Sequence, residues 1–333
     1  MRAKYLMRTL VFAFKNNHPV LIKSAPGIGK SEIVEQAARK LNYDLMIVHP
    51  VVEEPTDQKG IPWVVDGKAR FIPLHNLERM ITAKKELVVF IDDLGQATPA
   101  VQASYMQLLL ARQINGHKIS DFVRFVAATN RREDKSGVTG ILEAIKSRFD
   151  IIVELEMNVG DWIDWALRNG VPHEFISFTK FKPSLLHQFK PSRDIENYPC
   201  PRTVTKAGRM FKNGIDVDLR YEILKGCVGE AYAIEFETYL KVFMSLPTIG
   251  QIENDPYGSP IPNEISAKFA VSGMIAANIK TENANALISY LDKVDKELTI
   301  ATMKNISVSN PKVTASSAFT QWMIRNGKEL IEL

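Results

Sequence analysis

The chain has 333 residues, of which 45% are hydrophobic and 24% are charged, and its formal net charge is +4. This length is too great for one ordinary hydrophobic core and suits two domains, and the composition excludes a disordered or low-complexity protein. The small positive charge is spread among acidic residues, so nucleic acid is not indicated as a partner.

The cysteine and hydropathy patterns predict a cytoplasmic protein. Cys200 and Cys227 lack the spacing of metal ligands, so the sequence supports neither a zinc site nor a disulfide framework. The apolar run near the amino terminus is too short for a signal peptide, and no small-residue cleavage site follows it. No segment reaches the length that a membrane span needs, so we expect no membrane association.

Strand and helix patterns alternate through the first half of the chain. An amphipathic helix is expected over residues 1–16, and an apolar strand over residues 20–23 leads into SAPGIGKS and then into a helix from Lys30. The apolar run LVVFI, which ends before Asp92, suits a central parallel strand with both faces covered. The alternation predicts an α/β core with a parallel sheet over residues 1–157.

A β-hairpin insertion is expected within this core, at about residues 54–72. Asp66 and Gly67 form a typical hairpin turn between two β-prone runs. We interpret Trp63 as a packed tryptophan of an ordinary hairpin, and the alternative is that it faces a partner or a central pore.

The second half of the chain is predicted to be helical. Helical periodicity covers residues 158–246, and it continues over residues 247–333, which form a C-terminal helical region. Between these two parts, LPTIGQIENDPYGSPIPNE is polar and rich in Pro and Gly, so we expect a long loop there.

The stretch SAPGIGKS has the pattern of a phosphate-binding loop, with Ser24 where the usual motif has glycine. Two glycines remain where the backbone must curl around phosphate oxygens, and Lys30 and Ser31 open a helix whose amino terminus favours anions. Lys30 is expected to reach the β- and γ-phosphates. The alternative is a glycine-rich turn that binds nothing. The expected nucleotide-binding residues of the loop are Pro26, Gly27, Ile28, Gly29, Lys30 and Ser31.

Two carboxylates follow the apolar strand at the edge where α/β sheets bind ligands. Asp92 is expected to hold Mg²⁺ together with Ser31, and Asp93 is placed to polarise a water molecule for attack on the γ-phosphate. The alternative is that both aspartates only cap the next turn.

These residues carry a resemblance to the AAA+ ATPases, specifically to the MoxR-like group with dynein-related ATPase modules. SAPGIGKS resembles Walker A, and VVFIDD resembles Walker B, where the family usually has Asp-Glu and this chain has the shorter Asp93. The resemblance implies a P-loop NTPase core followed by an all-α lid, which residues 158–246 would form. It also implies ATP and Mg²⁺ as ligands and ATP hydrolysis as the activity.

Three further residues take roles that the resemblance implies. Asn130, at the end of FVAATN, is similar to the sensor 1 residue that helps to orient the attacking water, and Arg148 in KSRFD resembles the arginine finger that enters a neighbouring subunit's site. Arg202 in CPRTVTKAGRMF resembles the sensor 2 residue of the lid, which contacts the nucleotide phosphates. Other candidates for the finger are Arg131, Arg132 and Lys146.

The function that this resemblance implies is an ATP-hydrolysing remodelling or chaperone-type motor. An arginine supplied across subunits implies a homo-oligomeric ring, expected to be a hexamer, and MoxR-like relatives often act with a protein that bears a von Willebrand factor A domain. One alternative is a nucleotide-gated assembly scaffold with little turnover, which the shorter Asp93 and the serine at position 24 favour. Another alternative is a nucleic-acid motor.

Overall fold

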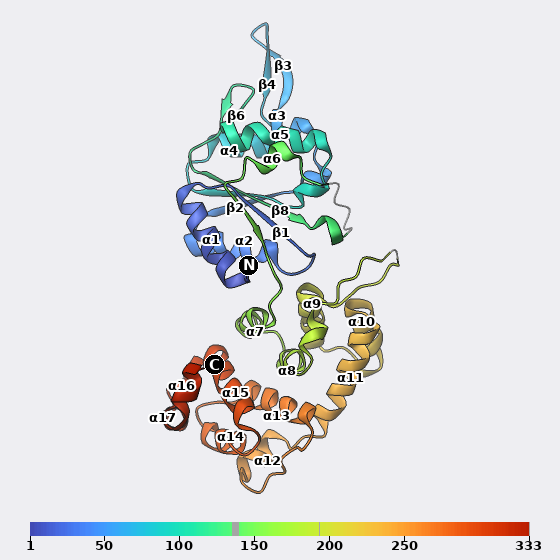
Figure 1. Ribbon diagram of the computed structural model, residues 1–333, viewed down its shortest axis with the longest axis vertical. Coiled ribbons are helices and arrows are strands. Elements are labelled where there is room, and N and C mark those ends of the chain that lie inside the picture. The colour runs from blue at the N-terminus through green and yellow to red at the C-terminus, as the bar shows by residue number, and fades with distance from the viewer. Residues whose placement is uncertain (135–139, 193, 333) are drawn as a thin grey trace. The chain divides into compact units, whose positions relative to one another are not determined.

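The computed structural model describes residues 1–134, 140–192 and 194–332. Its contacts divide the chain into two units, Met1–Asn158 and Val159–Leu333 (Figure 1). The first unit is an α/β structure and the second consists of helices, so the fold class expected from the sequence is confirmed. The expected division into three parts, with boundaries after residues 157 and 246, stays a prediction.

A five-stranded parallel sheet forms the centre of the first unit, and the strand order is β2–β5–β8–β1–β9. All five strands therefore present their carboxyl ends at one edge, where ligands bind in sheets of this kind. The strands are β1 (Val20–Ser24), β2 (Asp44–Val48), β5 (Leu87–Ile91), β8 (Val123–Asn130) and β9 (Ile151–Glu154).

Helices cover both faces of this sheet (Figure 1). Strand β5 is apolar throughout because both of its faces are buried. Val88 and Phe90 enter the core on one face, and Leu87, Val89 and Ile91 enter the core on the other. The first face packs against α1 (Ala3–Asn16) and α2 (Lys30–Leu41). The second packs against α4 (His75–Thr82), α5 (Pro99–Ala111) and α6 (Glu143–Lys146).

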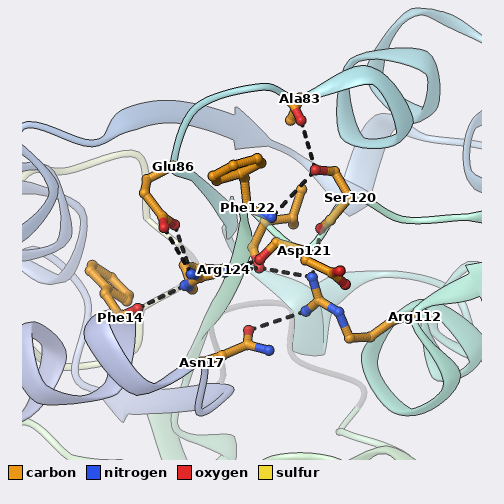
Figure 2. Close-up of polar contacts among 10 residues, drawn as sticks. Phe14, Asn17, Ala83, Glu86, Arg112, Ser120, Asp121, Phe122 and Arg124 are labelled. Atoms are coloured by element: carbon orange, nitrogen blue, oxygen red, sulfur yellow. Dashed lines mark hydrogen bonds and ion pairs between the residues drawn. The ribbon is translucent and has the colours of Figure 1, made fainter.

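Arg124, near the start of β8, contacts residues of neighbouring segments at the edge of the sheet opposite the carboxyl ends of the strands (Figure 2). Its Nε donates to the backbone oxygen of Phe14 at 2.8 Å, and its Nη2 lies 2.8 Å from a carboxylate oxygen of Glu86. The Arg124 side chain is 11% exposed and that of Glu86 is 29% exposed. Water therefore screens this ion pair much less than a pair on the open surface.

Arg112 makes a second set of contacts at the same edge (Figure 2). It ends α5 in the left-handed backbone conformation, with φ of +49°. Its Nη2 donates to the backbone oxygens of Ser120 at 2.8 Å and Val123 at 3.0 Å, and its Nη1 donates to Oδ1 of Asn17 at 3.1 Å. The ends of α1 and α5 are thus joined to the start of β8.

Replacement of Arg124 by alanine is expected to lower the free energy of unfolding by about 2 kcal/mol, because it leaves the partly buried Glu86 carboxylate without its cation. Urea unfolding of the purified chain measures the change. Lys118→Ala is the matched control, since its pair with Asp121 is long, at 3.5 Å, and highly exposed, and we expect no measurable change. Equal effects of the two substitutions would contradict the structural role of Arg124.

The hairpin β3 (Ile61–Val65) and β4 (Lys68–Ile72) projects from the first unit (Figure 1). It turns at Asp66 and Gly67, which have φ values of +53° and +71°, as the sequence predicts. The expectation that Trp63 packs is wrong, because its side chain is 66% exposed. The hairpin is a two-stranded ribbon with no core beneath it, so alternation along its strands does not bury either face.

A second hairpin braces the base of the first. Strands β6 (Gln113–Ile114) and β7 (His117–Lys118) are joined by a turn in which Asn115 donates from Nδ2 to the backbone oxygen of Lys59 at 2.8 Å. Nε2 of His117 lies 2.8 Å from the backbone oxygen of Phe71. This hairpin is not among the elements predicted from the sequence, although its Asn-Gly turn is a typical signal.

Buried polar contacts hold the short helix α3 (Pro55–Lys59), which precedes the projecting hairpin, against α5. Gln58 is 3% exposed, donates from Nε2 to the hydroxyl of Tyr105 at 3.1 Å and accepts from the hydroxyl of Ser104 at 2.9 Å. The Tyr105 hydroxyl in turn donates to the carboxylate of Glu53. Burial raises the pKa of Glu53. The hydrogen bonds from Gln58 fix the base of the projecting hairpin to α5, the helix that follows the two aspartates.

Among its described residues, the second unit has helices packed around two apolar clusters. One cluster contains aromatic side chains of α8 and α11, with the ring centroids of Phe175 and Phe236 4.2 Å apart, and the other includes Leu287, Met303 and Trp322. The helices are α7 (Val159–Arg168), α8 (His173–Phe181), α9 (Pro201–Lys212), α10 (Val217–Val228), α11 (Glu230–Met244), α12 (Ile249–Asn254), α13 (Ile265–Asn278), α14 (Ala284–Leu291), α15 (Lys296–Ser309), α16 (Pro311–Thr314) and α17 (Ser317–Glu332).

Helix α12 corrects one expectation, because it lies inside the stretch that the sequence analysis interpreted as a long loop. Thr248 caps it by accepting from the backbone N–H of Gln251, and the Gln251 side chain accepts from the backbone N–H of Thr248 at 2.8 Å. This reciprocal capping box outweighs the Pro- and Gly-rich composition nearby. Among the described residues, no helix is both long and apolar enough to cross a membrane.

Gly273→Ala is expected to destabilise the second unit, because a Cβ at Gly273 of α13 would lie 2.6 Å from the Cβ of Ser177 on α8. Forcing these helices apart costs about 1–3 kcal/mol. Gly226→Ala in α10 is the matched control, since its Cβ would meet nothing within 4 Å, and we expect it to stabilise by about 0.5–1 kcal/mol. Thermal unfolding measures both variants, and destabilisation by Gly226→Ala alone would contradict this packing.

Candidate functional site

The loop after β1 has the backbone of a phosphate-binding loop. Gly27 and Gly29 have φ values of +76° and +104°, which glycine adopts without strain. A Cβ on Gly29 would meet no atom within 4 Å, so the backbone conformation, and not lack of space, requires glycine there. Pro26 precedes the first of these glycines, Ile28 lies between the two, and both residues are half-buried. The loop ends at the amino terminus of α2, whose first N–H groups have no intrahelical acceptor and attract anions.

Lys30, the first residue of α2, turns back towards the sheet. Its side chain is largely buried, with the residue 8% exposed. Its amine donates to the hydroxyl of Ser24 at 3.0 Å and to Oδ1 of Asn130 at 2.7 Å. The two acceptors are neighbours because the parallel register of β1 and β8 pairs Ser24 directly with Asn130.

The two aspartates lie beside the same loop, after the end of β5. The hydroxyl of Ser31 donates to Oδ2 of Asp92 at 3.0 Å. Nδ2 of Asn130 lies 3.4 Å from Oδ1 of Asp93, which adopts a left-handed backbone conformation with φ of +56°. Residues from the exits of β1, β5 and β8 and from the start of α2 therefore meet at one edge of the sheet.

The residues present fit a Mg²⁺ ion. Mg²⁺ is usually held by one or two protein oxygens together with substrate phosphates and water, and the Ser31 hydroxyl and the Asp92 carboxylate are two such oxygens in direct contact. Among the described residues, no group of three or more His, Cys, Asp or Glu side chains offers an all-protein metal site. The Ser31 and Asp92 oxygens suit a Mg²⁺ ion whose other ligands are phosphate oxygens and water.

Arg148 is remote from this edge. Two residues after it, Asp150 donates its N–H to the backbone oxygen of Pro19, at the entrance of β1, whereas the phosphate loop follows the exit of β1 at Ser24. Strand residues rise about 3.3 Å each, so about 13 Å separates the two edges. The guanidinium of Arg148 donates to the backbone oxygen of Ala144 and to the hydroxyl of Ser147, which are both neutral.

Two of the other candidates for the arginine finger are held by acidic residues. Arg131 makes two hydrogen bonds of 3.0 Å to Asp134, which raise its pKa, and Lys146 pairs with Glu143 in its own helix. Arg148 differs from both, because the hydrogen bonds that it makes with described residues go to neutral oxygens and none goes to a carboxylate.

Arg202 belongs to the second unit. It follows Pro201 in the first turn of α9 and is exposed. The turn is fixed by Thr203, whose hydroxyl accepts from the backbone N–H of Cys200 at 2.9 Å. Its role towards a nucleotide stays a prediction.

The fold and the site define a P-loop nucleotide-binding protein, with a phosphate loop between the first strand and helix of a parallel sheet and two carboxylates at the end of a neighbouring strand. Residues 19–149 match the AAA domain family of the dynein-related subfamily. The resemblance to AAA proteins that is identified from the sequence is confirmed for these residues.

A search of solved structures finds remote similarities, and no curated protein matches the sequence. The Thermotoga maritima RuvB Holliday junction branch migration motor is 15% identical, with 98% of this chain and 87% of that chain covered and a TM-score of 0.40. A single-residue variant of the same protein is 15% identical, with 82% and 79% covered and a TM-score of 0.41. Neither similarity bears on what this chain binds.

One contact at the site has no counterpart in the sequence analysis, which treats Ser24 only as a tolerated departure from glycine. The structure gives its hydroxyl a hydrogen bond from Lys30. The register between β1 and β8 creates this contact, and register is a non-local property that neither strand's sequence reveals by itself.

Proposed function

We propose that this chain is an ATP-hydrolysing AAA+ motor of the MoxR-like type, which remodels a protein partner in the cytoplasm. It acts as a homo-oligomeric ring of six copies. The observation that supports the nucleotide chemistry most directly is the convergence of Lys30, Asn130 and Asp93 on one sheet edge, beside the contact between Ser31 and Asp92. Each of these side chains then has a part in ATP hydrolysis.

The phosphate loop and Lys30 bind the triphosphate. The amides of the loop and of the first turn of α2 donate to the phosphate oxygens, and the amine of Lys30 balances charge on the β- and γ-phosphates. Ser31 and Asp92 would hold Mg²⁺, which supplies further neutralisation of phosphate charge when it is bound.

Asp93 and Asn130 act on the attacking water. Asp93 accepts a proton from the water, or polarises it, as it approaches the γ-phosphate, and the amide of Asn130 fixes its orientation. The 3.4 Å separation between Asn130 Nδ2 and Asp93 Oδ1 supports this pairing, since one water molecule can contact both side chains.

Arg148 completes the site of a neighbouring copy. Its position near the entrance of β1 supports action between subunits, because the phosphate loop of its own chain is at the exit of that strand. A guanidinium delivered to the γ-phosphate stabilises charge in the transition state, an effect worth about 10³ to 10⁵ in rate in nucleotide hydrolases.

The helical unit converts nucleotide state into movement in this proposal. Arg202 contacts the phosphates from the first turn of α9, so hydrolysis changes the angle between the units and shifts the partner that the ring holds. A protein with a von Willebrand factor A domain is the proposed partner, on the strength of the MoxR-like resemblance.

Lys30→Ala and Asp93→Asn are expected to separate binding from turnover. Loss of the amine removes charge-assisted hydrogen bonds to two phosphates, so ATP should bind about 100-fold more weakly or worse. Asp93→Asn should bind ATP nearly as well as the wild type and hydrolyse it about 10² to 10⁴ times more slowly. Titration calorimetry with a slowly hydrolysed ATP analogue and steady-state phosphate release measure the two properties.

Asp121→Asn is the control for this pair, because Asp121 is exposed at the opposite edge of the sheet, and its turnover should equal that of the wild type. Equal loss of binding in Lys30→Ala and Asp93→Asn would contradict the separate roles. A wild-type chain that binds ATP and releases phosphate no faster than Lys30→Ala would favour the nucleotide-gated scaffold.

Arg148→Ala is expected to assemble and to bind ATP, but to hydrolyse it about 10³-fold more slowly, because the neighbouring site loses its guanidinium. Mixing this variant with Lys30→Ala should restore activity, since roughly a quarter of the interfaces in randomly mixed rings then join an intact loop to an intact Arg148. Phosphate release is measured across the mixing ratio.

Two controls make this mixing experiment specific. Mixing Arg148→Ala with a chain that carries both Lys30→Ala and Arg148→Ala should restore nothing. Arg39→Ala, in an exposed pair with Glu35, should leave turnover unchanged. Failure of the first mixture to recover any activity would contradict action of Arg148 between subunits.

A further inference from the structure

A small polar cavity lies among the helices of the second unit, between α8, α13 and α15. Its volume is about 10 Å³, which is room for one particle of the size of a water molecule. Part of its wall is apolar and includes Leu167, Ile176 and Phe269. The polar side chains of the wall are His173, Ser177 and Lys180 on α8, Ser272 on α13, and Thr302 and Asn305 on α15.

The hydroxyl of Ser272 has no hydrogen-bond partner among the residues that the structure describes. Ser272 is only 3% exposed, so bulk water does not satisfy this hydroxyl. The hydroxyls of Ser177 and Thr302 differ, because each donates at 2.7 Å to a backbone oxygen of its own helix. Buried polar groups in native proteins are satisfied by protein atoms, water or ions, so we expect an acceptor from outside the chain beside Ser272.

Lys180 brings a positive charge to the same cavity. Burial lowers its pKa to about 8, so most of the amine is still protonated at pH 7. Asp164 of α7 acts on the amine through its charge and not through a hydrogen bond, and no acidic side chain of the described residues lines the cavity. His173 adds no charge, because burial and the charge of Lys180 lower its pKa to about 4. A buried cation is costly unless an anion compensates it.

We propose that this cavity binds one small inorganic anion, such as chloride, between the amine of Lys180 and the hydroxyl of Ser272. The anion accepts hydrogen bonds from both groups, and the Asn305 amide is a further donor in the wall. A water molecule would accept from the same donors but would leave the lysine charge without a counter-charge. The anion joins α8 to α13 and α15 and therefore stabilises the helical unit. All of these residues belong to the second unit, so the inference does not depend on the proposed ATPase function.

The test is thermal unfolding of the full chain at constant ionic strength, with gluconate replaced stepwise by chloride. Gluconate is too large for the cavity. The midpoint of unfolding should rise by about 2–4 °C between zero and about 100 mM chloride, because an anion that binds only the folded state stabilises it. Tryptophan fluorescence follows this unit, since it contains three of the four tryptophans of the chain: Trp162, Trp165 and Trp322.

Three variants tie the chloride effect to the cavity. Lys180→Met removes the charge and keeps a long unbranched side chain, so the chloride dependence should disappear. Ser272→Ala removes one donor and should raise the chloride concentration that gives half of the effect about 3- to 10-fold. Lys241→Met, at an exposed position of α11, is the matched control and should keep the dependence of the wild type.

Crystals grown with bromide locate the anion directly, because bromide scatters X-rays anomalously. An anomalous peak in contact with Lys180 and Ser272 would support the proposal, and it would do so even if Lys180→Met failed to fold. A water molecule alone at this place, in crystals that contain bromide, would overturn it. A wild-type midpoint that does not respond to chloride would also overturn it. So would a chloride effect that persists in Lys180→Met, since the anion would then bind elsewhere, for instance at the phosphate loop.

Discussion

The positive charge of Lys30 is the constraint on which the nucleotide-binding unit depends. A largely buried amine is costly unless hydrogen bonds and charges compensate it, and the first turn of α2 holds this one against the sheet. The register between β1 and β8 supplies Ser24 and Asn130 together, and Asn130 extends the network to Asp93. Loop, sheet and carboxylates are thereby assembled around one side chain.

The opposite edge of the same sheet explains how that register is kept. Arg124 and Arg112 join the start of β8 to the end of α1 and to the end of α5 through backbone oxygens, and Arg124 also pairs with the carboxylate of Glu86 (Figure 2). A slip of one residue would move every side chain to the other face of the sheet. Contacts at the strand entrances thus preserve the arrangement at the strand exits.

The sequence predicted those features of the fold that depend on local patterns. Alternation of strands and helices, the glycines of the phosphate loop and the Asp66-Gly67 turn all appear in the structure as expected. The errors have different causes. A capping box at Thr248 begins a helix in a stretch whose composition indicated a loop, and the Asn115-Gly116 turn was visible but missed.

Other features of the site could not be predicted, because they arise from contacts between distant parts of the chain. The hydrogen bond from Lys30 to Ser24 requires that the side chain of Lys30, in α2, point back towards β1. The pairing of Ser24 with Asn130 joins residues that are more than a hundred positions apart in the sequence. The exposure of Trp63 likewise depends on what surrounds the hairpin and not on the hairpin's own alternation.

The projecting hairpin has a consequence for how this chain can diverge. The contacts that fix it, from Asn115, His117 and Gln58, all lie at its base, while Trp63 and Val64 are about two-thirds exposed. Substitutions at the exposed end therefore remove little buried surface, and exposed positions of this kind tolerate exchange well. Relatives of this chain can therefore come to differ at this tip while the arrangement at the carboxyl edge of the sheet is inherited unchanged.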